Sequence, residues 1–192
     1  MHTHHYLVIA GTTRPLRRSP AVAQWIAGLG EGVADAEFRV VDLQDLGLGL
    51  DDDPGIPAIG AYVRETTRAW SKLVSAAAGV VFVTPQYNWG YPAPLKNAID
   101  HLYREWKGKP ALIVTYGGHG GGRCAGQLRE VLTGMNLNLT TTMPALHLAR
   151  ARIEADDGVV EPHVDFENHL EELRVALREL IALAKAETAV AD

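Results

Sequence analysis

The stretch GVVFVTPQYNWGYPAPLKNAID, residues 79–100, joins a predicted strand to a predicted helix through an unusual turn. Its first five residues form a continuous apolar run, which is typical of a strand covered on both faces of a sheet. A helix is expected from Ala93 to Leu102, and Pro92 and Pro94 stiffen its entry. The turn carries proline, glycine, asparagine and three aromatic rings, so a stiff, amide-rich surface stands where the strand ends.

The same order of apolar run, turn and helical stripe recurs along the chain. Apolar residues three and four positions apart indicate helices, and short continuous apolar runs indicate buried strands. By these criteria five strands alternate with five helices. This alternation predicts a doubly wound α/β sandwich, in which a five-stranded parallel sheet has helices on both faces. The predicted strands are Tyr6–Ala10, Glu37–Leu43, Gly79–Val83, Pro110–Tyr116 and Asn136–Thr142, and the predicted helices are Ser19–Gly30, Ala61–Ala78, Ala93–Leu102, Gly122–Met135 and Phe166–Ala186.

The composition is that of an ordinary globular protein, with 47% of the 192 residues hydrophobic and 21% charged. We expect one domain over residues 1–192, with residues 187–192 as a disordered tail. No apolar run approaches the roughly 18 residues of a membrane span, and the start MHTHHYLVIAG lacks the pattern of a secretory signal. A single cysteine, Cys124, suits a reducing compartment, so we expect a cytoplasmic protein.

The net charge of −5 gives no general attraction to nucleic acid or to an anionic membrane, so an anionic ligand requires a local basic cluster. Two stretches suggest metal ligands, MHTHHY and Asp51-Asp52-Asp53. Neither has a second matching ligand cluster, so we interpret them as a solvated end and a solvated loop and expect no metal.

Ligands of doubly wound sheets bind at the carboxyl ends of the strands, which directs attention to three loops. Loop one, GTTRPLRRSPAV (residues 11–22), follows the first strand and offers two threonines, three arginines and a helix start with Ser19 as a predicted N-cap. A helix N-terminus together with Arg14 and either Arg17 or Arg18 would suit a dianionic phosphate. The alternative is a solvated basic turn with an ordinary cap.

Loop two, TPQYNWGYP (residues 84–92), is rigid because proline has no backbone N–H and a fixed φ angle. Such a loop presents backbone amides at fixed positions with little ordering entropy lost on binding, which suits a flat heteroaromatic ring. Tyr87, Trp89 and Tyr91 add apolar bulk. The alternative is a proline-rich connection whose aromatic rings pack in the core or against a partner subunit.

Loop three, YGGHGGGRCAG (residues 116–126), has five glycines within six residues, which allow the backbone to approach a ligand closely. The alternative is a flexible loop. Its formal match to a dinucleotide fingerprint is discounted, because it follows the fourth strand and no acidic residue lies between Glu130 and Glu154 to bind a ribose. Cys124 stands where a helix start would favour a thiolate, or is simply a small packed residue.

Taken together, GTTRPLRRSPAVAQWI, TPQYNWGYPAPLKNAIDHL and YGGHGGG resemble the NADPH-dependent FMN reductase family of flavodoxin-like proteins. The second motif is the most specific. The family usually carries Pro-Glu-Tyr-Asn before Leu-Lys-Asn-Ala-Ile-Asp, and this chain has Pro85-Gln86-Tyr87-Asn88 and Leu95-Lys96-Asn97-Ala98-Ile99-Asp100. The resemblance runs in order from Tyr6 to about Leu183.

The resemblance implies that loop one holds the FMN phosphate and that loops two and three hold the two edges of the isoalloxazine ring. The implied cofactor-binding residues are Thr12, Arg14, Arg17, Ser19, Ala21 and Val22 (the last two through their amides), then Pro85, Gln86, Tyr87 and Asn88, then Gly117, Gly118, His119 and Gly120. Two positions depart from the family pattern. Thr12 replaces a serine and keeps the hydroxyl, whereas Gln86 replaces a glutamate and removes a negative charge near the ring.

The resemblance also implies the chemistry. NADPH or NADH would pass hydride to the flavin and leave, and a small acceptor such as a free flavin, quinone or azo compound would take its place. No protein nucleophile is needed, so no catalytic residue is nominated; His119 is a weak candidate for donating a bond or proton. The rival is an electron carrier like flavodoxin, or an FMN-binding protein without turnover. A homodimer or homotetramer with its active site near the interface is expected, with Trp89, Tyr103 and Trp106 either at that interface or in the core.

Overall fold

A parallel sheet forms the centre of the protein. The structure, a computed structural model, describes residues 5–34 and 36–191. The strand order is β2-β1-β3-β4-β5, every ladder is parallel, and the short β6 also pairs with β4. The chain thus moves outward from β1 to β2 and then returns to build the other half of the sheet, as predicted for a doubly wound fold. The strands are β1 (His5–Ala10), β2 (Glu37–Asp42), β3 (Gly79–Pro85), β4 (Pro110–Gly117), β5 (Asn138–Leu139) and β6 (Ala145–His147).

Amphipathic helices cover both faces of the sheet, which explains why the inner strands are continuous apolar runs. Across the described residues, every helix is too short or too polar to traverse a lipid bilayer. The longer helices are α1 (Ser19–Val33), α2 (Glu65–Ala76), α3 (Ala93–Asp100), α4 (Gly122–Gly134) and α7 (Leu170–Ala191), and the short ones are η1 (Arg104–Trp106), α5 (Arg150–Glu154), α6 (Pro162–Asp165) and η2 (Glu167–His169).

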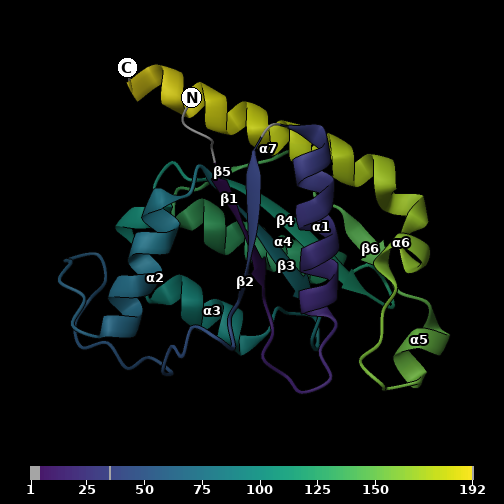
Figure 1. The fold of residues 1–192 in the computed structure, drawn as a ribbon. Coiled ribbons are helices and arrows are strands. Elements are labelled where there is room, and N and C mark those ends of the chain that lie inside the picture. The colour runs from purple at the N-terminus through teal and green to yellow at the C-terminus, as the bar shows by residue number, and fades with distance from the viewer. Residues whose placement is uncertain (1–4, 35, 192) are drawn as a thin grey trace.

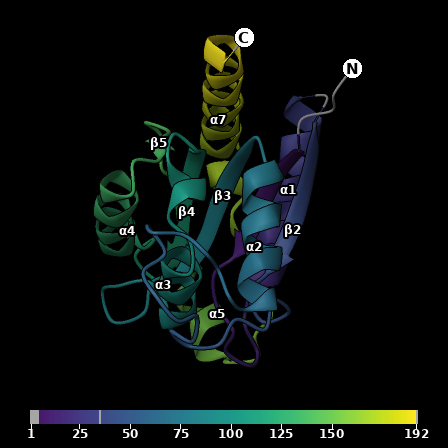
Figure 2. The ribbon, with the colours of Figure 1, turned by 90° about the vertical axis from the view of Figure 1, so that its left-hand side faces the viewer.

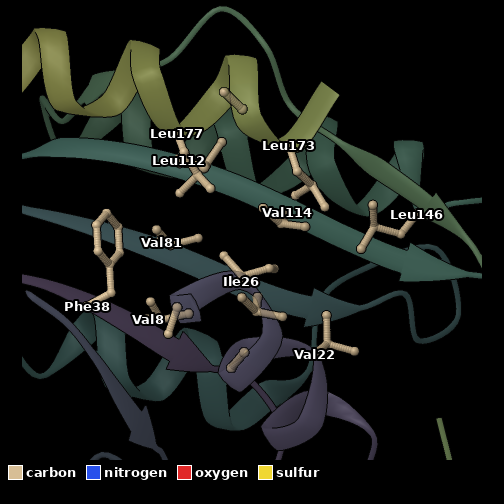
Figure 3. Close-up of a cluster of buried hydrophobic side chains, with 14 of the residues drawn as sticks. Val8, Val22, Ile26, Phe38, Val81, Leu112, Val114, Leu146, Leu173 and Leu177 are labelled. Atoms are coloured by element: carbon tan, nitrogen blue, oxygen red, sulfur yellow. The ribbon is translucent and has the colours of Figure 1, made fainter. Parts of the chain in front are cut away.

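Alternate residues of each inner strand enter two different cores. Val8, Val81 and Leu112 are aligned across β1, β3 and β4 and pack under α1 and α7, as Figure 3 shows. Their neighbours on the opposite face pack under α2, α3 and α4, where Trp70 and Trp106 are fully buried. Figures 1 and 2 show this arrangement, with α2 and α3 on one side of the sheet and α1 and α7 on the other. Trp106 is therefore a core residue, which confirms the core alternative for this tryptophan.

The second helix starts later than its sequence predicts, at Glu65 and not at Ala61. The amides of Val63 and Arg64 donate to the two carboxylate oxygens of Asp53, each at 3.0 Å. These bonds hold the chain in an extended form before the helix begins. Asp53 lies ten residues before Val63, so the helical spacing of apolar residues does not reveal this contact. The loop before α2 is attached to α3 of the same chain, because the side-chain oxygen of Asn97 accepts a hydrogen bond from the amide of Asp51 at 2.9 Å.

The predicted strand Asn136–Thr142 is also wrong in extent, because β5 ends at Leu139 and β6 begins at Ala145. Between them the amides of Thr141 and Thr142 donate to one carboxylate oxygen of Glu179 on α7, each at 2.9 Å. Amides bound to a side chain cannot join a strand ladder. The edge of the sheet is therefore two short pieces that pair with opposite ends of β4.

The C-terminal helix differs from its prediction at both ends. Residues 167–169 form a short 3-10 turn, and α7 runs from Leu170 to Ala191. The expected disordered tail at residues 187–192 is helical up to Ala191, where it continues the preceding helix. Asp192 lies outside the described residues, as do residues 1–4 of the histidine-rich start.

Candidate functional site

A cavity of about 370 Å3 lies at the carboxyl ends of β1, β3 and β4, where loops one, two and three meet. This position is the one at which doubly wound sheets bind their ligands. A second cavity of about 410 Å3 lies between residues 51–58 and α3, away from these strand ends. The lining of the first cavity includes predicted residues from all three loops: Arg14, Arg17, Pro85, Gln86, Tyr87, Asn88, Gly117 and Gly118.

Two pairs of hydroxyl groups fasten loop one to its neighbours. Thr12 Oγ1 lies 3.0 Å from the hydroxyl of Tyr87 in loop two. Ser19 Oγ lies 2.8 Å from the hydroxyl of Tyr116 at the start of loop three, and both residues are buried. Ser19 is the first residue of α1 and makes no capping bond, so its predicted role as an N-cap is wrong. Burial raises the pKa of Tyr116, which keeps this hydroxyl protonated.

One of the two predicted amide donors in the first turn of α1 is already engaged within the chain. The N–H of Val22 donates to the carbonyl of Arg18 at 3.1 Å, so it is not available to a ligand and this prediction is wrong. Ala21 precedes it in the first turn, where backbone N–H groups lack helical partners. The side chains of Thr12, Ser19 and Val22 are buried and do not line the cavity.

The three arginines of loop one have three different environments. Arg17 pairs with Asp42 at 2.6 Å, and its Nε atom is buried without a hydrogen-bond partner. Arg14 stacks on the ring of Tyr87 with its guanidinium carbon 4.0 Å from the ring centre. Within the described residues, Arg14 has no carboxylate partner. Arg18 binds backbone carbonyls of a later segment, as described below. Asp42 and Asp157 thus face Arg17 and Arg18, and Arg14 supplies the positive charge of the lining that no carboxylate pairs with among the described residues.

Loop two is built on a tight turn, as its composition predicts. Tyr87 and Gly90 exchange both backbone hydrogen bonds, at 2.8 and 3.0 Å. The two residues between them, Asn88 and Trp89, have φ angles of 46° and 76°, the pattern of a type I′ turn. A tryptophan in this left-handed region is uncommon. Its ring is covered by the guanidinium of Arg123, 3.1 Å from the ring centre, and it is 61% exposed.

Gln86 and Cys124 join loop two to the start of α4. Gln86 Oε1 accepts the amide of Cys124 at 3.2 Å, so this side chain binds one of the free donors at the helix N-terminus. The thiol of Cys124 is fully buried and lies 3.7 Å from the carbonyl of Pro85. Burial raises its pKa to about 12, so the packed-residue interpretation is confirmed and the thiolate alternative is wrong.

Loop three uses its glycines in two ways. Gly117 and Gly118 line the cavity. Gly120 instead packs on the sheet edge, because a Cβ there would lie 2.6 Å from the carbonyl oxygen of Ala145, and its φ is 69°. Gly120 and the exposed His119 are absent from the cavity lining. The structure thus does not bring these two predicted residues to the site.

The sequence reasoning missed a fourth side of the cavity, formed by Leu148, Ile153 and Asp156. These residues follow β6, whose carboxyl end lies at the same rim of the sheet. Ligands of doubly wound sheets bind at the carboxyl ends of the strands, and this rule, applied to β6 as well, would have identified these residues. Arg18 holds this segment by donating to the carbonyls of Arg152 at 2.6 Å and Val159 at 3.0 Å.

Comparison with known proteins agrees with this geometry. Residues 5–152 match the model of the family described as NADPH-dependent FMN reductase. An NAD(P)H-dependent FMN reductase of Schizosaccharomyces pombe is 49% identical over 183 residues, which is 94% of this chain and 90% of the relative. A quinone reductase of Escherichia coli is 38% identical over 99 residues, covering 48% of this chain and 49% of the relative.

Among solved structures, a flavoenzyme NAD(P)H:(acceptor) oxidoreductase of Paracoccus denitrificans superposes with a TM-score of 0.70. It covers 96% of this chain and 98% of that one at 21% identity, a likeness of fold. The match of the family model spans β1 to α5 and includes the three loops around the cavity. The chain belongs to the NADPH-dependent FMN reductase family.

Proposed function

We propose that this chain is an NAD(P)H-dependent reductase that holds FMN in the cavity between loops one, two and three and reduces small quinone-type acceptors. The observation that carries the proposal is the cavity itself. Loops from three neighbouring strands meet there, with Arg14 and the unpartnered Nε of Arg17 at one side and glycine backbone at the other. Family membership supports the cofactor and the co-substrate.

The residues of loop one fit a phosphate group. Arg17 Nε is a buried donor with no partner, and Arg14 is a cation without a carboxylate among the described residues. A bound phosphate would satisfy both, and hydrogen bonds to charged groups contribute about 1.5–3 kcal/mol each. The amide of Ala21 in the first turn of α1 adds a donor and the favourable field of a helix N-terminus.

The residues of loops two and three fit a flat ring. Gly117 presents backbone without a side chain to the cavity, and the turn at Tyr87 is fixed by two backbone hydrogen bonds. Hydroxyl pairs hold loop one against both of these loops, so the three walls keep their relative positions. A preorganised site of this kind loses little entropy when it binds.

The chain's own residues bind, orient and shelter, and they need not form a covalent bond. When bound, FMN supplies the hydride chemistry between nicotinamide and acceptor. Tyr116 contributes a protonated hydroxyl that is already bonded to Ser19, and its raised pKa makes it a poor proton donor. His119 is exposed and does not line the cavity, which argues against the role of proton donor suggested for it.

We further propose a homodimer or homotetramer in the cytoplasm, with the cavity near a subunit interface. Trp89 is 61% exposed and Tyr103 is 42% exposed, so both rings are accessible to a partner subunit, and aromatic residues are enriched in such interfaces. One cysteine in 192 residues is consistent with a reducing compartment. Size-exclusion chromatography with light scattering tests the assembly, and a monomer at micromolar concentration would contradict it.

The decisive test of the function is steady-state oxidation of NADPH and of NADH by the FMN-loaded chain with 1,4-benzoquinone. We expect turnover at roughly 1–1000 per second, the usual range for enzymes. FMN bound without catalytic oxidation of either nucleotide would contradict the reductase and favour a simple electron carrier.

A further inference from the structure

The segment from Leu148 to Val160 forms a wall of the cavity that is built differently from the other three. It contains the short helix α5, which lies at the carboxyl-end rim of the sheet in Figures 1 and 2. Its last part lies outside the family match, which ends at residue 152. The walls from loops one, two and three carry the predicted cofactor contacts, whereas this wall contributes two aliphatic side chains and the carboxylate of Asp156.

Arg18 holds this wall in place. Its guanidinium donates to the carbonyls of Arg152 and Val159, and its Nη2 lies 3.6 Å from a carboxylate oxygen of Asp157. The side chain of Arg18 is only 14% exposed. Close packing adds to this hold, because a Cβ at Gly158 would lie 2.5 Å from the carbonyl oxygen of Leu16. The wall is therefore attached to loop one and has a defined position relative to the cavity.

Ile153 is the side chain that this wall presents over loop three. A Cβ placed on Gly118 would lie 3.1 Å from Ile153 Cδ1, so the isoleucine packs directly on that glycine. Ile153 also lines the cavity and remains 40% exposed, so it stands between the interior and solvent. Leu148, the other aliphatic residue of the wall, is 2% exposed and lies deeper.

We propose that Ile153 sets the size of the electron acceptor that can enter the cavity. The inference rests on the proposed function and adds a selecting residue to it. A bulky apolar side chain at the solvent side of the cavity admits a single-ring quinone and obstructs a larger one. Because Arg18 fixes the backbone on both sides of Ile153, the obstruction does not simply swing away.

The test compares 1,4-benzoquinone with 2-methyl-1,4-naphthoquinone as acceptors for the FMN-loaded chain, using the ratio of their kcat/KM values. Ile153→Ala should raise the naphthoquinone-to-benzoquinone ratio by about five- to tenfold, and Ile153→Phe should lower it by a similar factor. Val175→Ala is the matched control, since Val175 is an aliphatic residue of α7 that is 43% exposed and outside the cavity lining. Its ratio should stay at that of the unaltered chain.

Fluorescence titration of all four proteins with FMN distinguishes an effect on acceptor selection from an effect on cofactor binding. Ratios that stay the same in both Ile153 variants, with FMN bound as in the unaltered chain, would overturn this inference alone. A large loss of FMN affinity in Ile153→Ala with an unchanged ratio would also overturn it, because the side chain would then contact the cofactor. Failure of the unaltered chain to bind FMN would contradict the proposed function, and this inference would fall with it.

Discussion

The hydroxyl of Tyr116, the penultimate residue of β4, lies 2.8 Å from Oγ of Ser19, the first residue of α1. Both side chains are buried. The contact joins loop one to loop three, the two of the three loops that are furthest apart in sequence. This hydrogen bond attaches the start of α1, which we propose faces the phosphate of FMN, to the end of β4, which we propose faces its ring.

Tyr116→Phe should leave the hydroxyl of Ser19 buried without a partner. A lost partner of this kind costs about 1–3 kcal/mol of stability, which denaturant unfolding measures. The FMN dissociation constant should rise by about fivefold, equivalent to about 1 kcal/mol, because loop one is no longer fixed to β4. The double variant with Ser19→Ala should cost less than the sum of the two single changes. Strictly additive costs would show that the hydroxyl pair makes no stabilising contact.

Arg14→Ala should weaken the binding of FMN without weakening that of riboflavin, which lacks the phosphate. Arg14 has no carboxylate partner in the described part of the chain, so its removal leaves no charge unpaired. The expected loss is roughly ten- to a hundredfold for FMN, the range of one or two charge-assisted hydrogen bonds. Arg39→Ala, an exposed arginine on β2, is the control. Equal losses for both flavins would assign Arg14 to the ring and not to the phosphate.

Gln86→Glu should make the reduction potential of the bound flavin more negative. The carboxylate keeps the bond from the Cys124 amide and is favoured in its charged form by the N-terminus of α4. A negative charge beside an anionic reduced flavin opposes reduction by roughly 10–40 mV, which is about 0.5–2 kcal/mol for two electrons. Gln127→Glu adds the same charge on α4 outside the cavity lining and serves as the control. An equal or higher potential in the Gln86 variant rules the interpretation out.

Glu179→Gln should destabilise the protein at neutral pH and lose its effect in acid. Burial alone would raise the pKa of Glu179, but hydrogen bonds from Thr142 and Thr141 outweigh it and lower the pKa below its ordinary value. A lowered pKa contributes stability above the unfolded value of about 4.3, and that stability is lost as the pH falls through the folded pKa. The expected cost at pH 7 is about 0.5–1.5 kcal/mol, since the carboxylate is partly solvated.

The control for this experiment is Glu167→Gln, which alters an exposed glutamate of η2. Chemical unfolding at pH 7 and near pH 3 measures both variants against the unaltered chain. The curves of Glu179→Gln and the unaltered protein should converge at the lower pH. A difference that persists there would mean that the amide form itself distorts the segment between β5 and β6.

The parts of the fold that local sequence could predict are those set by local forces. Continuous apolar runs identified β1, β3 and β4, and the composition after β3 identified the turn that Tyr87 and Gly90 close with two backbone hydrogen bonds. The late start of α2 and the division of the edge strand could not be predicted in this way. Both features result from carboxylates, those of Asp53 and Glu179, which accept hydrogen bonds from backbone amides ten or more positions away in the sequence.

The same distinction holds for the site. The three loops could be located because the carboxyl ends of parallel strands share one rim. The roles of individual side chains were less predictable, because they depend on partners elsewhere in the chain. Arg17 pairs with Asp42, and Arg18 holds residues 152 and 159 rather than facing the cavity alone.

Isothermal titration calorimetry of the purified, cofactor-free chain with FMN, and in parallel with riboflavin, tests the central claim most directly. The account predicts one FMN per chain, with FMN bound at least tenfold more tightly than riboflavin because Arg14, Arg17 and the start of α1 meet the phosphate. No heat of binding with FMN, or equal affinity for the two flavins, would contradict it.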